Sequence, residues 1–247
     1  MQTCKYCGRL KTLVKSHIIP RSFCEIKSFQ QNAPHNALSL PSDSADLKPV
    51  KRSIGMCDDE LFCKVCEDKF MIYDAYAFKL LHEQGNRRKT LRDEQGQVLG
   101  AYYETYDYNK LKLFFISVLL RAGLSDVFFF KHVKVGPYLE QLKDAVDAGA
   151  APASNDFAVF PAYYDEIKRG PILFPPSQKR IQKIKFFYFH IGQVIFYIKI
   201  DKRATPQELQ PIILQPSGKL VLMTLSHKDP ANFDILKGIE RIRHGIE

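Results

Sequence analysis

Cysteine placement is the strongest chemical signal in this sequence. All six cysteines lie within the first 66 residues: Cys4, Cys7, Cys24, Cys57, Cys63 and Cys66. Four of them form two Cys-x-x-Cys pairs, Cys4/Cys7 and Cys63/Cys66. A spacing of two residues lets both thiolates of a pair face one ion, and two pairs complete the tetrahedron that Zn²⁺ prefers. We therefore predict one structural zinc site on these four residues, with a long segment inserted between the pairs.

The other two cysteines leave an alternative open. Cys24 and Cys57 have no partner at the same spacing, and we expect both to be small buried hydrophobic residues. Cys57 lies six residues before Cys63, so it could still substitute as a ligand. A redox role for either pair would call for a strand-to-helix turn within a βαβ pattern, which the sequence does not show.

A histidine stands between the two pairs, in the phrase Ser16-His17-Ile18-Ile19-Pro20-Arg21. Imidazole titrates near neutral pH, so a histidine can act as a general base. The alternative is a hydrogen-bonded structural histidine. Carboxylates flank the second pair, with Asp58 and Asp59 before it and Glu67 after it. Their simpler interpretation is a solvated acidic turn and an acidic residue in the first turn of a helix.

The order of these motifs resembles the HNH endonuclease family: a Cys-x-x-Cys pair, a His-Ile-x-Pro phrase, and a second pair that opens a helix. The resemblance covers residues 3–70, and the Ser-His-Ile-Ile-Pro form looks like a branch of bacterial and phage proteins. It implies a ββα-metal, treble-clef-like zinc fold. It also implies a separate Mg²⁺ or Mn²⁺ against the scissile phosphate, and His17 as the general base that deprotonates water. The expected activity is metal-dependent cleavage of nucleic acid, with DNA favoured over RNA.

Three positions depart from the family pattern. Ser16 stands where the family has Asp or His, and Glu67 stands where it has His. Asp58, or Asp59 after a shift of one residue, stands where it has Asn. In one account these carboxylates replace the usual ligands, because hard cations prefer oxygen. In the other the active site has decayed, and the zinc module binds nucleic acid or a partner protein. His35, in the long insertion, is a further candidate near the site.

The family association alone suggests a role in an anti-phage defence or toxin system that needs a partner such as an ATPase. Oligomer formation is left open. We expect a cytoplasmic protein, because the sequence shows no signal-type segment and no apolar run of the ~20 residues that a membrane span requires.

The chain has 247 residues, a formal net charge of +9 and a pI of about 9.2. A basic balance favours contact with phosphates, although solvated lysines explain it equally well. The candidate nucleic-acid-binding residues are Arg21, Arg87, Arg88, Lys89, Lys179, Arg180 and Lys183. The last three precede the aromatic run Phe186–Phe189, whose rings could stack on bases. We favour the interpretation that these rings belong to the core.

The expected fold class is α+β. Hydrophobic periodicity predicts helices over residues 67–84, 109–122, 138–148 and 234–243. It predicts one hairpin over residues 185–200 and a second from strands at 212–214 and 219–225. We expect a zinc domain over residues 1–84, a connecting segment with a short hairpin over 85–106, and a mixed helical and antiparallel β region of unknown role over 107–247.

Overall fold

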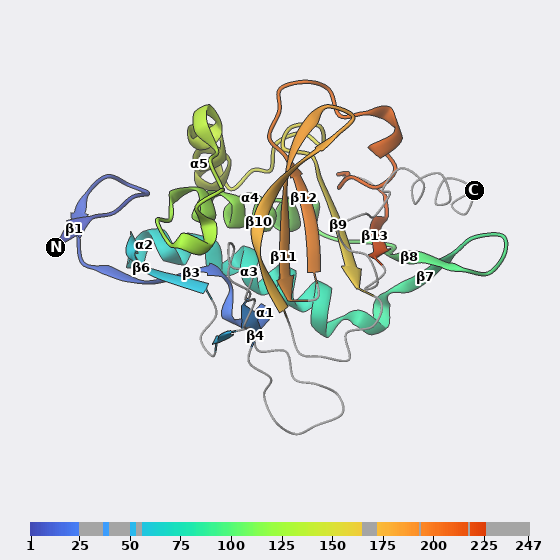
Figure 1. The fold of residues 1–247 in the computed structure, drawn as a ribbon, viewed down its shortest axis with the longest axis horizontal. Coiled ribbons are helices and arrows are strands. Elements are labelled where there is room, and N and C mark those ends of the chain that lie inside the picture. Colours follow the sequence, from blue (N-terminus) through green and yellow to red (C-terminus); the bar gives the residue numbers. More distant parts are fainter. Residues whose placement is uncertain are drawn as a thin grey trace.

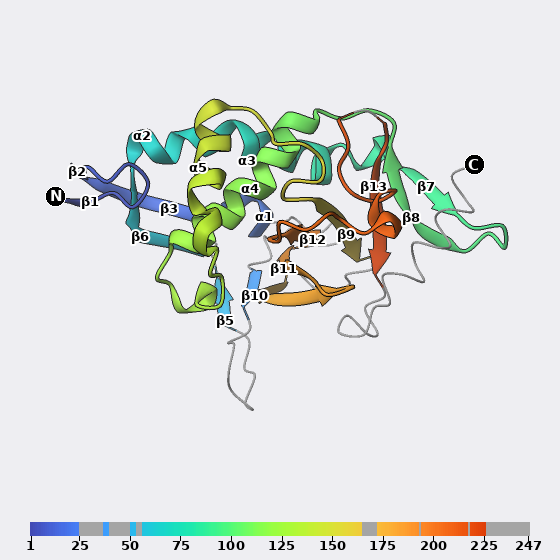
Figure 2. The ribbon, with the colours of Figure 1, turned by 90° about the horizontal axis from the view of Figure 1, so that it is seen from above.

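Helices and a large β-sheet form two layers in the computed structural model of this chain (Figures 1 and 2). The structure describes residues 1–24, 37–39, 50–52, 56–164, 172–192, 194–216 and 218–225. The cysteine-bearing N-terminal region lies at one end of the molecule, and a long hairpin projects from the other (Figure 1). The α+β class is confirmed.

The N-terminal region consists of two short antiparallel ladders and a helical run. β1 (Gln2–Thr3) pairs with β2 (Leu10–Lys11), and β3 (Leu13–Ile19) pairs with β6 (Met56–Cys63). A single helical turn, α1 (Arg21–Cys24), follows β3. The helical run begins directly after β6 and comprises α2 (Lys64–Glu67), the 3₁₀ turn η1 (Asp68–Phe70), α3 (Met71–Phe78) and the π-helical turn η2 (Lys79–Glu83). This run confirms the helix predicted over residues 67–84.

Two further helices complete the helical layer. α4 (Tyr108–Leu124) begins where the Asp107 carboxylate accepts a hydrogen bond from the Lys110 amide at 2.9 Å. α5 (Leu139–Ala148) ends at Gly149, which has the left-handed φ of +60° that favours glycine. Both confirm the sequence prediction. Short 3₁₀ turns complete the set: η3 (Gly85–Arg87), η4 (Phe128–Phe130), η5 (Gly136–Tyr138) and η6 (Gln207–Leu209). Within the described residues, no helix is both long and apolar enough to span a membrane.

The large sheet has nine strands in the order β5-β4-β10-β11-β12-β9-β13-β8-β7. Their bounds are β4 (Ala37–Ser39), β5 (Val50–Arg52), β7 (Lys89–Arg92), β8 (Val98–Tyr103), β9 (Val159–Tyr164), β10 (Ile172–Ile181), β11 (Ile184–Gly192), β12 (Val194–Lys199) and β13 (Leu220–Leu225). Neighbouring strands are antiparallel except for β4–β10 and β9–β13, which are parallel. The sheet is therefore mixed.

Both faces of the sheet are buried at its central strands β11 and β12, which explains their unbroken apolar sequences. Successive side chains of a strand point to opposite faces. In β11, Phe187 and Phe189 join the cluster beneath the helices, while Phe186 and Tyr188 join a second cluster on the other face. The segment around Ile212 covers that second face. The aromatic run is thus core, as favoured from the sequence, and its rings offer no exposed stacking surface.

The strands differ from the expectations in two places: the second hairpin, and residues 149–180, where no strand was predicted. The hairpin predicted from residues 212–214 and 219–225 is wrong, because 212–214 form a turn and β13 pairs with β8 and β9 instead. The Pro- and Ala-rich stretch over 149–180 contains β9 and most of β10. The segment over 85–106 does contain a hairpin, β7–β8, and that hairpin forms one edge of the large sheet. The helix predicted over 234–243 lies outside the described residues.

One hydrophobic cluster joins the cysteine-bearing region to the rest of the molecule. It includes Cys4 and Phe62 from the N-terminal ladders, Phe114 and Phe115 from α4, and Phe196 from β12. The rings of Phe115 and Phe196 lie 4.6 Å apart between centroids. The two regions expected from the sequence therefore share a core.

Candidate metal centre

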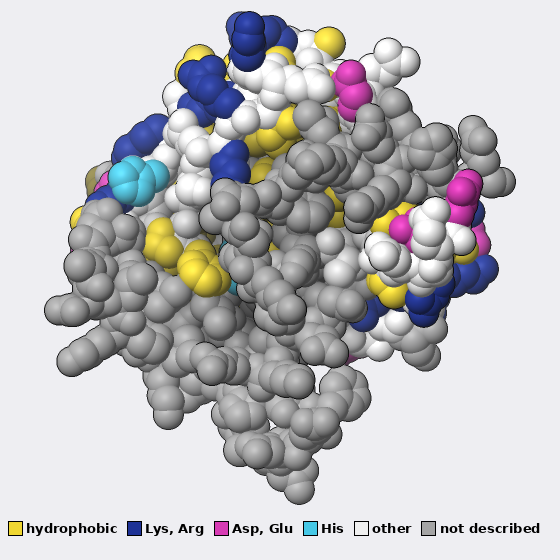
Figure 3. Space-filling model, turned by 45° about the vertical axis from the view of Figure 1, so that its right-hand side comes forward, with side chains coloured by type: hydrophobic (Ala, Val, Ile, Leu, Met, Phe, Trp, Pro, Cys, Tyr) yellow, Lys and Arg dark blue, Asp and Glu magenta, His cyan; other side chains and the backbone are white. Residues whose placement is uncertain are grey.

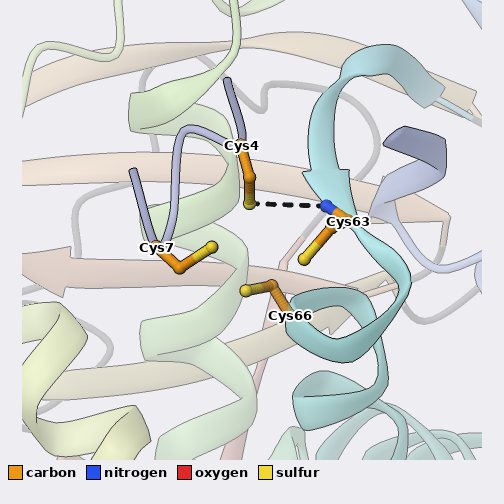
Figure 4. Close-up of side chains that lie close together, drawn as sticks. All are labelled: Cys4, Cys7, Cys63 and Cys66. Carbon is orange, nitrogen blue, oxygen red and sulfur yellow. Dashed lines mark hydrogen bonds between the residues drawn. The ribbon is translucent and has the colours of Figure 1, made fainter. Parts of the chain in front are cut away.

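Four cysteine side chains converge at the N-terminal end of the molecule (Figure 4). Cys4 and Cys7 come from the turn between β1 and β2, Cys63 ends β6, and Cys66 lies in α2. The sulfur atoms all lie within 4.8 Å of one another. A tetrahedron built on bonds of about 2.3 Å has edges of about 3.8 Å. The four thiols therefore fit a metal ion such as zinc, as the spacing predicts.

Hydrogen bonds of the local backbone hold the four cysteines close together. The turn that carries Cys4 and Cys7 closes through a hydrogen bond from the Gly8 amide to the Cys4 carbonyl at 2.8 Å, and Gly8 has a left-handed φ of +69°. The Cys63 amide donates to the Cys4 sulfur at 3.3 Å (Figure 4). This bond satisfies one of the free amides at the start of the helical run. This hydrogen bond links the two Cys-x-x-Cys pairs independently of a metal ion.

The thiol pKa values show why a cation belongs here. Burial raises the pKa of Cys4, but amide donors from Cys7, Cys63 and Tyr6 outweigh that effect and lower it to about 7. Burial and the neighbouring thiols raise the pKa of Cys66 well above its usual range. The raised pKa of Cys66 opposes its ionisation, and a bound divalent ion would favour the thiolate instead.

The remaining cysteines lie apart from this cluster. Cys24 is fully buried in the core, as expected. Cys57 is half-buried on β6 directly opposite His17 of β3. The structure therefore does not bring Cys57 into the group of four thiols as an alternative ligand.

His17 and Glu67 meet beside the cluster. The Glu67 carboxylate, one residue after Cys66, accepts a hydrogen bond from the His17 backbone amide at 3.1 Å through Oε1. Its other oxygen, Oε2, is buried and has no hydrogen-bond partner among the described residues. The same holds for His17 Nε2. Unpaired buried polar atoms are costly, so each of these two atoms has capacity for a further partner. The contact between the two residues runs through the His17 backbone amide.

Asp58 and Asp59 differ sharply in their surroundings. Asp58 pairs with Ser16 across the ladder and lies on the face opposite to His17 and Cys57. One Asp58 oxygen accepts from the Ser125 hydroxyl at 2.7 Å, and the other accepts from the Glu60 amide at 2.9 Å. Both oxygens are therefore engaged in structural bonds. Asp59 is exposed in a bulge of β6. Ser16 is fully buried and donates to the Val14 carbonyl.

Arg121 of α4 is a buried charge that the sequence reasoning did not connect to this site. Its side chain is fully buried, and its guanidinium forms a two-point ion pair with Asp74 of α3, at 2.8 and 2.7 Å. Nη1 also donates to the His17 carbonyl at 2.8 Å. A signal was present: Ser117, Arg121 and Ser125 recur at four-residue steps along the apolar C-terminal part of α4 and the residue that follows it, which places them on one face.

The predicted nucleic-acid-binding residues fall into separate places. Arg21 begins α1 and is exposed. Arg87 donates to Gln84 at 2.9 Å and lines a surface cavity of about 410 Å³ at the η2 end of the helical run, together with Lys79 and Tyr76. Arg88 is half-buried, and Lys89 forms an exposed ion pair with Glu104 at 2.8 Å.

The second basic group lies at the β10–β11 turn. Lys179 lies over the Tyr188 ring at 4.8 Å, and burial lowers its pKa. Arg180 and Lys183 are exposed. On the face in Figure 3, the Lys and Arg side chains shown in dark blue lie in several separate groups. His35 lies outside the described residues.

Comparison with known proteins adds no relative. Neither the protein-family models, nor the curated proteins, nor the solved structures give a match to this chain. The chemistry of the site is therefore argued from its own residues.

Proposed function

We propose that this chain is a metal-dependent endonuclease of the HNH type, with a structural zinc on the four cysteines. The observation that carries the proposal is the contact between His17 and Glu67 beside the cysteine cluster, with a buried and unpaired polar atom on each residue. The order of β3, β6 and the helical run from α2 supports a ββα-metal, treble-clef-like arrangement.

The two residues would divide the chemistry as follows. His17 Nε2 would accept the proton of the water that attacks phosphorus, because imidazole is basic enough near neutral pH. The Glu67 Oε2 atom would hold Mg²⁺ or Mn²⁺, which prefer oxygen ligands. That ion would neutralise charge on the phosphate and on the leaving oxygen. DNA is the favoured substrate.

Asp58 would serve a supporting role in this scheme. Because its two oxygens accept from Ser125 and Glu60, it has less capacity to bind a metal than Glu67. It would instead fix the bulge of β6 opposite the His17 strand. The exposed Asp59 is the other carboxylate to be tested as a metal ligand.

The test combines metal content with cleavage. Purified protein would be analysed for zinc and incubated with plasmid DNA and RNA in Mg²⁺ or Mn²⁺. We expect about one zinc per chain, cleavage by the native protein, and a loss of at least about 100-fold in His17→Ala and Glu67→Gln. Glu60→Gln is the matched control, because it removes an exposed carboxylate of β6 that has no role in this scheme, and it should cleave as the native protein does. Cleavage that is unchanged in His17→Ala would refute the proposal.

A second candidate function is a non-catalytic zinc module that binds nucleic acid or a protein. The observation that favours it is the engagement of Asp58 in structural bonds, which leaves the site with few open ligands. Zinc without cleavage of either substrate would support this candidate. If cleavage began only after a partner such as an ATPase was added, a partner-dependent nuclease would be indicated instead.

A further inference from the structure

We propose that Arg121, held by Asp74, is a positioning residue that fixes His17 against Glu67. The catalytic consequence rests on the proposed function, whereas the positioning itself can be tested without any activity. The groups that carry the proposal are the backbone amide and the backbone carbonyl of His17.

Both of these groups bond to side chains outside the β3–β6 ladder. The His17 amide donates to Glu67 Oε1 at 3.1 Å, and its carbonyl accepts from Arg121 Nη1 at 2.8 Å. The amide and carbonyl of one strand residue point to the same edge. Because this ladder has two strands in the described part of the chain, that edge of β3 would otherwise leave both groups without a described partner. A carboxylate from α2 and a guanidinium from α4 thus take the place of a third strand at this one residue.

The guanidinium is itself held firmly in place. Two of its bonds go to the Asp74 carboxylate, and two more go to Ser117, where Nε donates to the carbonyl and Nη2 to the hydroxyl, each at 3.2 Å. Its plane lies over the Phe70 ring at 5.0 Å. A buried arginine with this many partners has one accessible orientation, and in that orientation Nη1 reaches the His17 carbonyl.

The same face of α4 also holds the other strand of the ladder. Ser125, one helical turn beyond Arg121, donates to Asp58 of β6 at 2.7 Å. One helix therefore bonds to β3 through Arg121 and to β6 through Ser125. These two bonds fix the position of the β3–β6 ladder, and with it His17, relative to the helical run that carries Glu67. Arg121 acts through His17 and is not a catalytic residue itself.

The test uses the full chain with two variants and one control. The double variant Arg121→Met with Asp74→Leu removes both buried charges together, because removing one alone would leave its partner unpaired. Arg121→Lys keeps the positive charge but loses the planar fork that reaches Asp74 and His17 together. Tyr103→Phe is the control, because it removes a buried hydrogen bond, 2.6 Å to the Leu80 carbonyl, away from the ladder.

The first readout is amide hydrogen exchange at His17, measured relative to the Cys63 amide that donates to the Cys4 sulfur. We expect this ratio to rise by at least about tenfold in both Arg121 variants and to stay unchanged in Tyr103→Phe. The second readout is cleavage, where we expect kcat to fall by at least about tenfold with KM within about twofold. Zinc content should be unchanged.

The outcomes separate this proposal from the proposed function. If the native protein does not cleave, the proposed function fails, and the exchange ratio alone decides the role of Arg121. If the double variant does not fold, Arg121→Lys carries the test. An exchange ratio and a kcat equal to those of the native protein would overturn the proposal. Equal losses in Tyr103→Phe would show that the effect is only one of stability, and would overturn it as well.

Discussion

At the scale of single residues, burial rather than residue type decides the protonation state of His82. Its ring lies between Phe23 and Phe78, with centroid distances of 4.9 and 5.2 Å. Its Nε2 atom is buried without a hydrogen-bond partner among the described residues. Burial, and then the charge of Arg88, lower the pKa of His82 from 6.5 to about 4. The native protein therefore keeps this imidazole neutral in a pH range where the unfolded chain protonates it.

We predict that this difference makes the protein less stable as the pH falls. The stabilising contribution is fully present above pH 6.5 and is lost progressively as the pH falls from 6.5 towards 4. Between pH 7 and pH 5 the loss of stability amounts to about 2 kcal/mol. Urea titrations should show that the free energy of unfolding of His82→Phe decreases between pH 7 and pH 5 by about 2 kcal/mol less than that of the native protein. The exposed His132→Gln is the control. A native-like pH slope in His82→Phe would contradict the prediction.

The sequence predicted the site residues unevenly, for physical reasons. The spacing of Cys4, Cys7, Cys63 and Cys66 shows ligand geometry directly, because two residues between thiols already suit one ion. The resemblance in motif order placed His17 and Glu67 in one expected site, but it did not predict the hydrogen bond from the His17 amide to the Glu67 carboxylate. Arg121 was not connected to the site from the sequence, because its partners lie on β3 and α3, far away in the sequence. Reading the polar stripe of α4 would have placed Arg121 toward the core, but its partners still come from the fold.

At the scale of elements, the β10–β11 turn carries a conformational cost. Ile181 pairs with Ile184, so only two residues make the turn, Gln182 and Lys183. Their φ values are +47° and +67°. Two-residue turns with both φ values positive match the twist of a hairpin, but they favour Asn and Gly. Gln182 and Lys183 both carry a Cβ, which is unfavourable at these left-handed φ values, and both side chains are exposed.

We predict that Gln182→Asn with Lys183→Gly stabilises the protein. The gain should be about 1 kcal/mol, because glycine removes the left-handed penalty and no packed side chain is lost. The melting temperature should rise by about 2–4 °C. Lys202→Gly, in an exposed loop without a positive φ, is the matched control and should give no gain. Calorimetry of the three proteins checks this. A lower melting temperature in the double variant would contradict it.

Helices were predicted better than strands because helical patterns are local. α4 and α5 show their periodicity and their ends within the segment itself. β9 and most of β10 lie in a Pro-rich stretch, and β9 pairs with β12 and β13, which come later in the chain. β13 shows the same difficulty most clearly. Its nearest neighbour in sequence, the segment at 212–214, had suggested a hairpin, but its actual partners are β8 and β9.

At the scale of the whole molecule, the shared core couples the metal site to the sheet. Cys4, Cys63 and Cys66 belong to the same hydrophobic cluster as α4 and β12. Tyr6, between the first two cysteines, also donates to Asp147 of α5 at 2.7 Å. A loss of order at the cysteines therefore removes contacts from both layers.

We predict that metal removal destabilises the entire chain as one unit. After chelation, the melting temperature should fall by at least about 10 °C, because binding of a structural zinc contributes strongly to folding. Far-ultraviolet circular dichroism and tyrosine fluorescence should report the same shifted transition. Cys57→Ser, outside the cluster of four, should melt as the native protein does. Two separate unfolding transitions after chelation, of which only one is shifted to lower temperature, would contradict the prediction.

The position of β13 has a consequence for how the chain reaches this structure. β13 lies between β9 and β8, so the last described strand separates elements that are much earlier in the sequence. During synthesis, β8 and β9 each present an unpaired edge until residue 225 has emerged from the ribosome. Such edges template wrong pairings between chains, and pairing across long separations is slow. We therefore expect β13 to join the sheet late in folding, and chains that stop before residue 220 to aggregate more readily than the full chain.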